Sequence, residues 1–153
     1  MNTSLKFFVA GLPMTAGSKR AVPTPAGTRV IESGSRAVRD AKAAWRADII
    51  EAARRADGWD PERGPVVLSC HFFLRRPQSH YRTGRFAGEL RASAPIRPTT
   101  TPDLSKLARA VEDALTVAGV VWRDDSQVVS CQHSKFYADA GRPVGVKVQV
   151  SAL

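Results

Sequence analysis

The strongest constraint on the fold is an amphipathic pattern between residues 104 and 118. Its apolar residues recur at the intervals that place side chains on one face of a helix. They are Leu104, Leu107, Ala108, Val111, Ala114, Leu115 and Ala118. Thr101 is expected to cap this helix, with Pro102 in its first turn, and Gly119 is expected to end it. A helix with one apolar face must be covered, so the rest of the chain has to supply a layer that packs on it.

Apolar runs elsewhere in the chain predict the strands of a sheet. Long strands are expected at residues 5–9, 66–74, 128–137 and 144–150, with short ones at 20–22 and 28–31. The last two long strands are expected to form a hairpin around residues 138–143.

A second helix is predicted from Ser35 to a stop at Gly58 and Pro61. Its apolar stripe consists of Val38, Ala41, Ala44, Trp45, Ile49 and Ala52. Together, the patterns predict an α+β fold: a small mixed or antiparallel sheet packed by two helices, in one domain over residues 1–153.

Residues 76–101 show neither helical nor strand periodicity. The segment is rich in proline and glycine and carries several arginines but a single acid, Glu89. A long stretch without periodicity in a compact domain is usually functional or disordered. It is therefore predicted to be a flexible basic loop, either simply solvated or a DNA-contacting arm.

The charge of the chain favours a polyanionic partner. Lysine and arginine total 23 against 14 acids, a formal charge of +9, and the excess lies in residues 1–100. Nucleic acid is the expected partner. No secretory signal or membrane span is evident, and Cys70 and Cys131 lie in apolar runs, so we expect reduced core thiols in a cytoplasmic protein without a membrane partner.

The acidic residues after residue 100 are candidates for metal chemistry. Asp103 opens the predicted helix and Asp124-Asp125 forms the turn after it, and a strand folding back could bring these positions together. Converging carboxylates would suit Mg²⁺ beside a phosphodiester, which is nuclease chemistry. The alternative is purely structural, because aspartate is favoured at helix starts and in turns.

Other chemistries find little support in the sequence. Arg109 and Asp113 are four residues apart, so a surface ion pair is the default interpretation. His71, His80 and His133 lack ligand spacing. No glycine-rich phosphate loop follows a strand, and no nucleophile and base are arranged for acyl transfer, so no nucleotide cofactor is expected.

The residues from 102 to 129 resemble the signature of RusA-type Holliday junction resolvases, which are crossover junction endodeoxyribonucleases. That signature has an Asp-x-Asp pair opening a helix, a basic residue four positions later, Asp-Ala-Leu, and Asp-Asp-x-Gln-Val-Val. The matching residues here are Pro102-Asp103-Leu104-Ser105, Arg109, Asp113-Ala114-Leu115 and Asp124-Asp125-Ser126-Gln127-Val128-Val129. The resemblance implies a homodimeric endonuclease of bacterial or phage origin that resolves four-way DNA junctions with Mg²⁺, for which Mn²⁺ can substitute.

The resemblance also implies roles for individual residues. Asp103 and Asp125 would be metal ligands, with Asp124 as an auxiliary ligand or a structural residue. Arg109 would place a positive charge near the scissile phosphate, where the family commonly has lysine. The expected DNA contacts are Lys19, Arg20, Arg75, Arg76, Arg82, Arg85, Lys106 and Lys135.

Ser105 departs from the family pattern at a catalytic position. It replaces the second aspartate of the pair, and a neutral hydroxyl is a weaker Mg²⁺ ligand than a carboxylate. Three explanations are open: compensation by Asp124, an engineered substitution that traps a complex, or a protein that binds junctions without cutting them. A general DNA- or RNA-binding domain is a further alternative.

Overall fold

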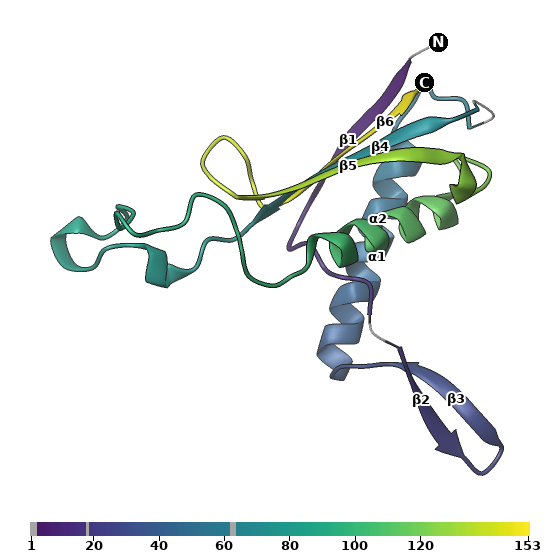
Figure 1. Cartoon of the computed structure of the whole chain (residues 1–153), viewed down its shortest axis with the longest axis horizontal. Helices are drawn as coiled ribbons and strands as arrows, with labels where there is room; N and C mark the ends of the chain where they lie inside the picture. Colours follow the sequence, from purple (N-terminus) through teal and green to yellow (C-terminus); the bar gives the residue numbers. More distant parts are fainter. Residues whose placement is uncertain (1–2, 18, 62–63) are drawn as a thin grey trace.

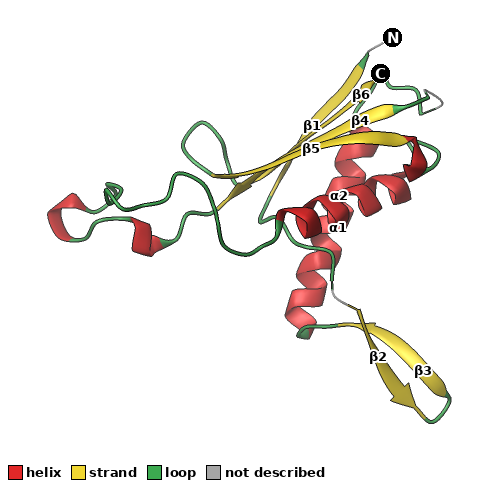
Figure 2. Cartoon of the chain, viewed as in Figure 1, coloured by secondary structure: helices red, strands yellow, loops and turns green. Residues whose placement is uncertain are grey.

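The computed structural model describes residues 3–17, 19–61 and 64–153, which form a four-stranded sheet, two long helices and a separate two-stranded hairpin (Figures 1 and 2). The strands are β1 (Ser4–Ala10), β2 (Lys19–Thr24), β3 (Gly27–Glu32), β4 (Val66–Leu74), β5 (Val128–Tyr137) and β6 (Gly145–Ala152). The helices are α1 (Arg36–Arg55) and α2 (Leu104–Ala118), with short 3-10 helices η1 (Gln78–His80), η2 (Gly84–Phe86) and η3 (Asp125–Gln127).

The sheet has the strand order β1-β6-β4-β5. β5 runs parallel to β4, while the β1–β6 and β4–β6 pairs are antiparallel. The predicted α+β fold, with a mixed sheet packed by two helices, is confirmed. The predicted hairpin of the last two strands is wrong, because β4 lies between them. Parallel strands need a long crossover connection, and α2 supplies the one between β4 and β5.

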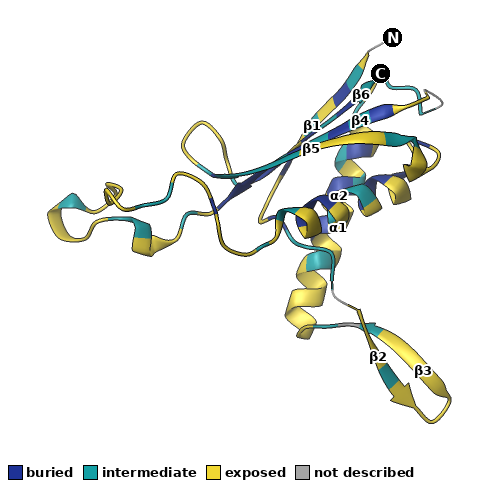
Figure 3. Ribbon diagram, viewed as in Figure 1, coloured by how far each residue is buried: buried dark blue, intermediate teal, exposed yellow. Residues whose placement is uncertain are grey.

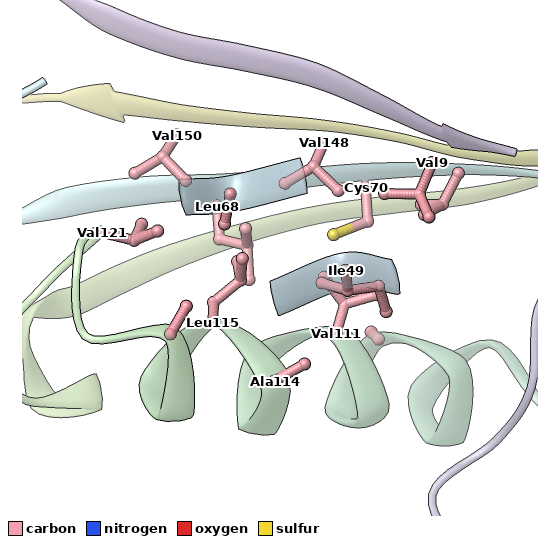
Figure 4. Close-up of a cluster of buried hydrophobic side chains, with 14 of the residues drawn as sticks. Val9, Ile49, Leu68, Cys70, Val111, Ala114, Leu115, Val121, Val148 and Val150 are labelled. Carbon is pink, nitrogen blue, oxygen red and sulfur yellow. The ribbon is translucent and has the colours of Figure 1, made fainter. Parts of the chain in front are cut away.

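One face of the sheet packs on both helices and forms the core (Figures 1 and 4). β4 contributes Leu68 and Cys70, and β6 contributes Val148 and Val150, all fully buried. Cys70 is thus a core thiol as predicted. Cys131 is exposed instead, because β5 is an edge strand whose first half is poorly covered.

The helix α2 presents its predicted stripe to the sheet, with Leu107, Val111 and Leu115 completely buried. Its N-cap is Asp103, not Thr101, so the helix begins later than expected. Lys135 binds the backbone of the chain that leads to Asp103. The helix ends at Gly119, whose positive φ of 70° favours glycine, as predicted.

Only the second half of α1 packs on the sheet. Trp45 and Ile49 are buried, whereas Val38 is 39% exposed and Ala41 and Ala44 are also on the surface side of the helix. The predicted stripe is therefore wrong in its first half, because α1 extends past the sheet toward the β2–β3 hairpin (Figure 3). Among the described residues, no helix is both long and apolar enough to cross a lipid bilayer.

Residues 76–101 form a projection that we call the finger (Figure 1). The sequence predicts no regular structure here, but the finger contains η1, η2 and a bridge between Tyr81 and Leu90. The Arg91 amide also donates to the His80 carbonyl at 2.9 Å. Backbone hydrogen bonds, which hydropathy patterns do not report, thus give the segment its shape.

Candidate active site and nucleic-acid groove

A groove of about 1050 Å³ lies between α1, α2, residues 15–17 and Lys19. The Ala16 amide donates to the Lys106 carbonyl at 3.1 Å, which fixes the segment 15–17 against the start of α2. Six basic side chains and two carboxylates line the groove. They are Lys19, Arg39, Lys42, Arg46, Lys106 and Arg109, with Asp113 and Asp125. A concave surface with this charge excess suits a phosphodiester backbone.

Half of these cations were missed by the sequence interpretation. Lys19, Lys106 and Arg109 are among the predicted site residues, but Arg39, Lys42 and Arg46 of α1 are not. The signal was present, because positions 39, 42 and 46 are spaced by three and four and so share one helix face. The sequence interpretation considered only the apolar stripe of that helix.

The start of α2 carries Asp103 and Ser105. The Asp103 carboxylate pairs with Lys106 at 3.3 Å, and its side chain makes no capping hydrogen bond. Ser105 lies exposed in the first turn. The Lys135 ammonium donates to the carbonyls of Thr100 and Pro102 at 2.9 and 3.0 Å, so it fixes the chain that leads to Asp103.

The two neighbouring aspartates after α2 have different surroundings. Asp124 caps η3: its carboxylate accepts a 2.9 Å hydrogen bond from the Ser126 amide, and Gln127 closes the capping box. Hydrogen bonds from Ser126 lower the pKa of the Asp124 carboxyl. Asp125 lines the groove instead. Asp124 is thus committed to the turn, and Asp125 faces the groove.

Glu112 of α2 is a neighbour of the groove residues Asp113 and Asp125 that the sequence interpretation did not consider. Burial raises the pKa of its carboxyl, and the negative charges of Asp125 and Asp113 raise it further, while Arg109 opposes them. Arg109 also pairs with Asp113 at 4.0 Å, as their spacing predicts. Three carboxylates therefore share one electrostatic environment beside the groove.

The structure does not bring Asp103 and Asp125 together within one chain. Asp103 caps the start of α2, whereas Asp125 lies in η3 close enough to Glu112 for the two negative charges to repel. Glu112 is nine residues beyond Asp103, which is about 14 Å along the helix axis. Among the described residues, no group of three or more acidic, histidine or cysteine side chains could hold a metal ion. Mg²⁺ is commonly held by one or two carboxylates together with waters and substrate phosphates, so within one chain Asp125 could supply one of its ligands.

The remaining predicted DNA contacts lie outside the groove. Arg20, in β2, and Arg75, which follows β4, are exposed. Arg76 donates to the Pro95 carbonyl at 2.8 Å and stacks on Tyr137, so it anchors the finger. Arg82 and Arg85 both lie over Phe86 of the finger, at 3.9 and 4.6 Å from the ring centre.

Comparison with known proteins places the chain in a nuclease family. The family model for endodeoxyribonuclease RusA matches residues 17–151, so the chain belongs to this family and the resemblance of residues 102–129 is confirmed. The uncharacterized protein YqaN of Bacillus subtilis (strain 168) is 34% identical over 89 residues. That alignment covers 58% of this chain and 61% of YqaN, which is less than two thirds of the relative's length.

Proposed function

We propose that this chain is a structure-selective, Mg²⁺-dependent endodeoxyribonuclease that resolves four-way DNA junctions as a homodimer. The observation that carries the proposal is the groove, which is lined by Lys19, by basic side chains of α1 and α2, and by the Asp113 and Asp125 carboxylates. Cations of this density bind a DNA backbone, and carboxylates next to them could take part in phosphodiester chemistry. Membership of the RusA family supports the same reaction.

Individual residues would divide the work as follows. Arg39, Lys42 and Arg46 would bind backbone phosphates along α1. Arg109 would hold the scissile phosphate, since its planar fork matches two phosphate oxygens and remains charged at any relevant pH. Lys135 would act as a positioning residue for Asp103, because both of its hydrogen bonds go to the backbone.

The proposal needs two copies of the chain. Asp103 and Asp125 lie too far apart to serve one cation within a protomer, but a two-fold dimer can bring opposite ends of α2 from different copies together. A four-way junction is itself close to two-fold symmetric, so such a dimer would place equivalent sites on two equivalent strands. The exposed apolar side chains Val38 and Val30 supply surface that a second copy could cover.

A second candidate function is junction binding without cleavage. Two observations favour it: Ser105 replaces a family carboxylate, and the remaining carboxylates of the described residues are dispersed within one chain. Loss of one negative charge weakens the attraction for a dication, whereas the basic groove would still bind DNA.

The deciding experiment is cleavage of a labelled synthetic four-way junction in Mg²⁺ or Mn²⁺, with a linear duplex as control. The unchanged protein is compared with Ser105→Asp, which restores the charge, and Ser105→Ala, which removes only the hydroxyl. Paired symmetric nicks by the unchanged protein would establish the resolvase. Cutting only by Ser105→Asp would mean that one residue disables the site.

Other outcomes would contradict the proposal. Tight junction binding without cleavage by any variant would favour the binding protein. Equal affinity for junction, duplex and single strand would contradict both functions and indicate a general nucleic-acid-binding domain.

A further inference from the structure

The face of the sheet opposite the helices is uncovered among the described residues (Figure 1). We call it the open face: it consists of alternate residues of β1, β6, β4 and β5, in register along Phe8, Lys147, His71 and Ser134. None of these alternate positions holds an acid, and Lys6, Lys147 and His71 lie among them. The open face is therefore positively charged and largely polar.

Three phenylalanine rings gather at one end of the open face. Phe73 of β4 and Phe136 of β5 are register partners whose rings stack at 5.5 Å with an interplanar angle of 22°. Gly145 of β6 is the next register partner of Phe73. A Cβ atom at Gly145 would lie 2.5 Å from the ring of Phe8, so glycine is what lets the Phe8 ring lie across β6 toward the other two.

Two arginines from outside the sheet lie over these rings. The Arg97 guanidinium, from the finger, is 4.3 Å from the centre of Phe136. Arg142, from the loop between β5 and β6, lies 5.5 Å from Phe136 and 5.7 Å from Phe73, and is paired with Asp139. Phe8 remains 40% exposed. The end of the open face thus combines one exposed ring, Phe8, with planar cations that lie over Phe136 and Phe73.

We propose that the open face binds an unpaired strand of DNA, with one base stacked on Phe8, another on the Arg97 guanidinium that lies over Phe136, and phosphates on Lys6 and Lys147. Aromatic side chains on a sheet and a surrounding positive surface are what single strands require, since every base offers a π face and every linkage a negative charge. A duplex conceals its base faces, so it gains little from this surface. The groove between the helices lies on the other side of the sheet, which leaves it free for duplex DNA.

A second copy of the chain is a poorer occupant of the open face. A two-fold contact through it would oppose lysines with lysines, because an isologous interface pairs the same patch with itself. Like charges at close range are unfavourable, whereas a polyanion neutralises them. The inference concerns binding alone and does not depend on whether the chain cuts DNA.

The test measures binding of a fluorescein-labelled thymidine oligomer of about 12 nucleotides, by anisotropy in EDTA, to the full chain. Phe8→Ala and Phe136→Ala are each expected to weaken single-strand binding roughly tenfold, the usual effect of losing one stacking platform. Val120→Ala, an exposed apolar residue in the loop after α2, is the matched control and should leave the affinity unchanged. Lys147→Gln should weaken single-strand binding, and Lys42→Gln should weaken duplex binding instead.

A second readout guards against misfolded variants. Phe8→Trp keeps an aromatic ring, so this variant should bind the oligomer normally. Its added indole fluorescence, measured as the difference from the unchanged protein, should be quenched on binding an unlabelled oligomer. Unchanged affinity in both alanine variants, or an added indole signal that stays unquenched at saturation, would overturn the proposal.

Two further outcomes separate this inference from its alternatives. A change of sedimentation mass in Phe8→Ala would overturn it, since the face would then join two copies. Single-strand binding without junction cleavage would leave it standing while the proposed function fails.

Discussion

Neighbouring residues of the same type have different roles here because their hydrogen-bond partners differ. Asp124 uses its carboxylate in the capping box of η3, whereas Asp125 is left facing the groove near Glu112. In the same way, Lys135 is bound to two carbonyls, whereas Lys42 lines the groove. Charge alone does not identify a functional side chain; its partners do.

Asp103→Asn and Asp125→Asn are each expected to abolish junction cleavage, in the Ser105→Asp background if the unchanged protein does not cut. Junction affinity should stay equal or rise, because each change removes a negative charge that repels phosphate. Gel-based cleavage and anisotropy measure the two effects separately. Asp48→Asn, an exposed position on α1, is the matched control and should cut normally. Normal cutting by either site variant would remove that residue from the catalytic site.

His133 makes stability depend on pH. Burial lowers the pKa of its imidazole below 6.5, and the nearby His71 lowers it further. The unfolded chain therefore binds the proton more readily than the folded chain. The stabilisation that neutral His133 gives the folded state is complete above about pH 7. It is lost as the pH falls through 6.5 toward the pKa of the folded state. The melting temperature should be lower at about pH 5.5 than at about pH 7.5, and His133→Gln should reduce this difference. If His80→Gln, in the finger, reduced it equally, the assignment to His133 would be wrong.

At the scale of elements, the helices and strands could be predicted from local periodicity in the sequence. The pairing of strands that are distant along the chain could not. The stripe of α2 and the alternating valines of β6 carry their own burial pattern, so both elements were found close to their bounds. Strand order leaves no such trace. β5 and β6 are consecutive along the chain, yet β4 separates them, and only the long α2 crossover hints at this arrangement.

The candidate site shows the same division. Motif spacing identified Asp103, Arg109 and Asp125 as candidates. It did not predict the separation of Asp103 from Asp125, which depends on how the chain after α2 folds back along that helix. Arg39, Lys42 and Arg46 become site residues only because α1 lies against α2. Glu112 owes its raised pKa to burial and to Asp125, which are tertiary effects.

The finger should be separable from the fold. Between residues 78 and 97 no described residue is buried, and Arg82 and Arg85 lie there. Replacing residues 82–89 by two glycines, between the bridged residues Tyr81 and Leu90, should lower junction affinity roughly tenfold with little change in melting temperature. Anisotropy measures the junction affinity, and circular dichroism measures the melting temperature. A collapse of the melting temperature would show that the finger belongs to the core.

At the scale of the whole molecule, the sheet separates two positively charged surfaces of different character. The groove side carries basic side chains from both helices, which we propose bind a DNA backbone, and the open face carries rings and cations, which we propose bind bases. A branched DNA offers both kinds of target within a short distance, so the two proposed surfaces together would favour DNA structure over DNA sequence.

Groove binding predicts a strong and residue-specific salt dependence. The affinity for a junction should fall linearly with salt on a double logarithmic plot, and the combined change Arg39→Gln, Lys42→Gln and Arg46→Gln should reduce the slope by about 3, since each phosphate contact contributes about 1. Arg36→Gln is the control, because Arg36 pairs with Asp40 and does not line the groove. An unchanged slope in the triple variant would mean that these three side chains do not contact DNA phosphates.

The contrast between a buried Cys70 and an exposed Cys131 gives the chain one natural attachment point for a nitroxide. Burial and the charge of Glu112 raise the pKa of the Cys131 thiol, so coupling should be faster in mildly alkaline buffer. In a two-fold dimer, one labelled position per protomer yields a single spin–spin distance. Pulsed resonance on the unaltered sequence would therefore measure how far β5 lies from the symmetry axis.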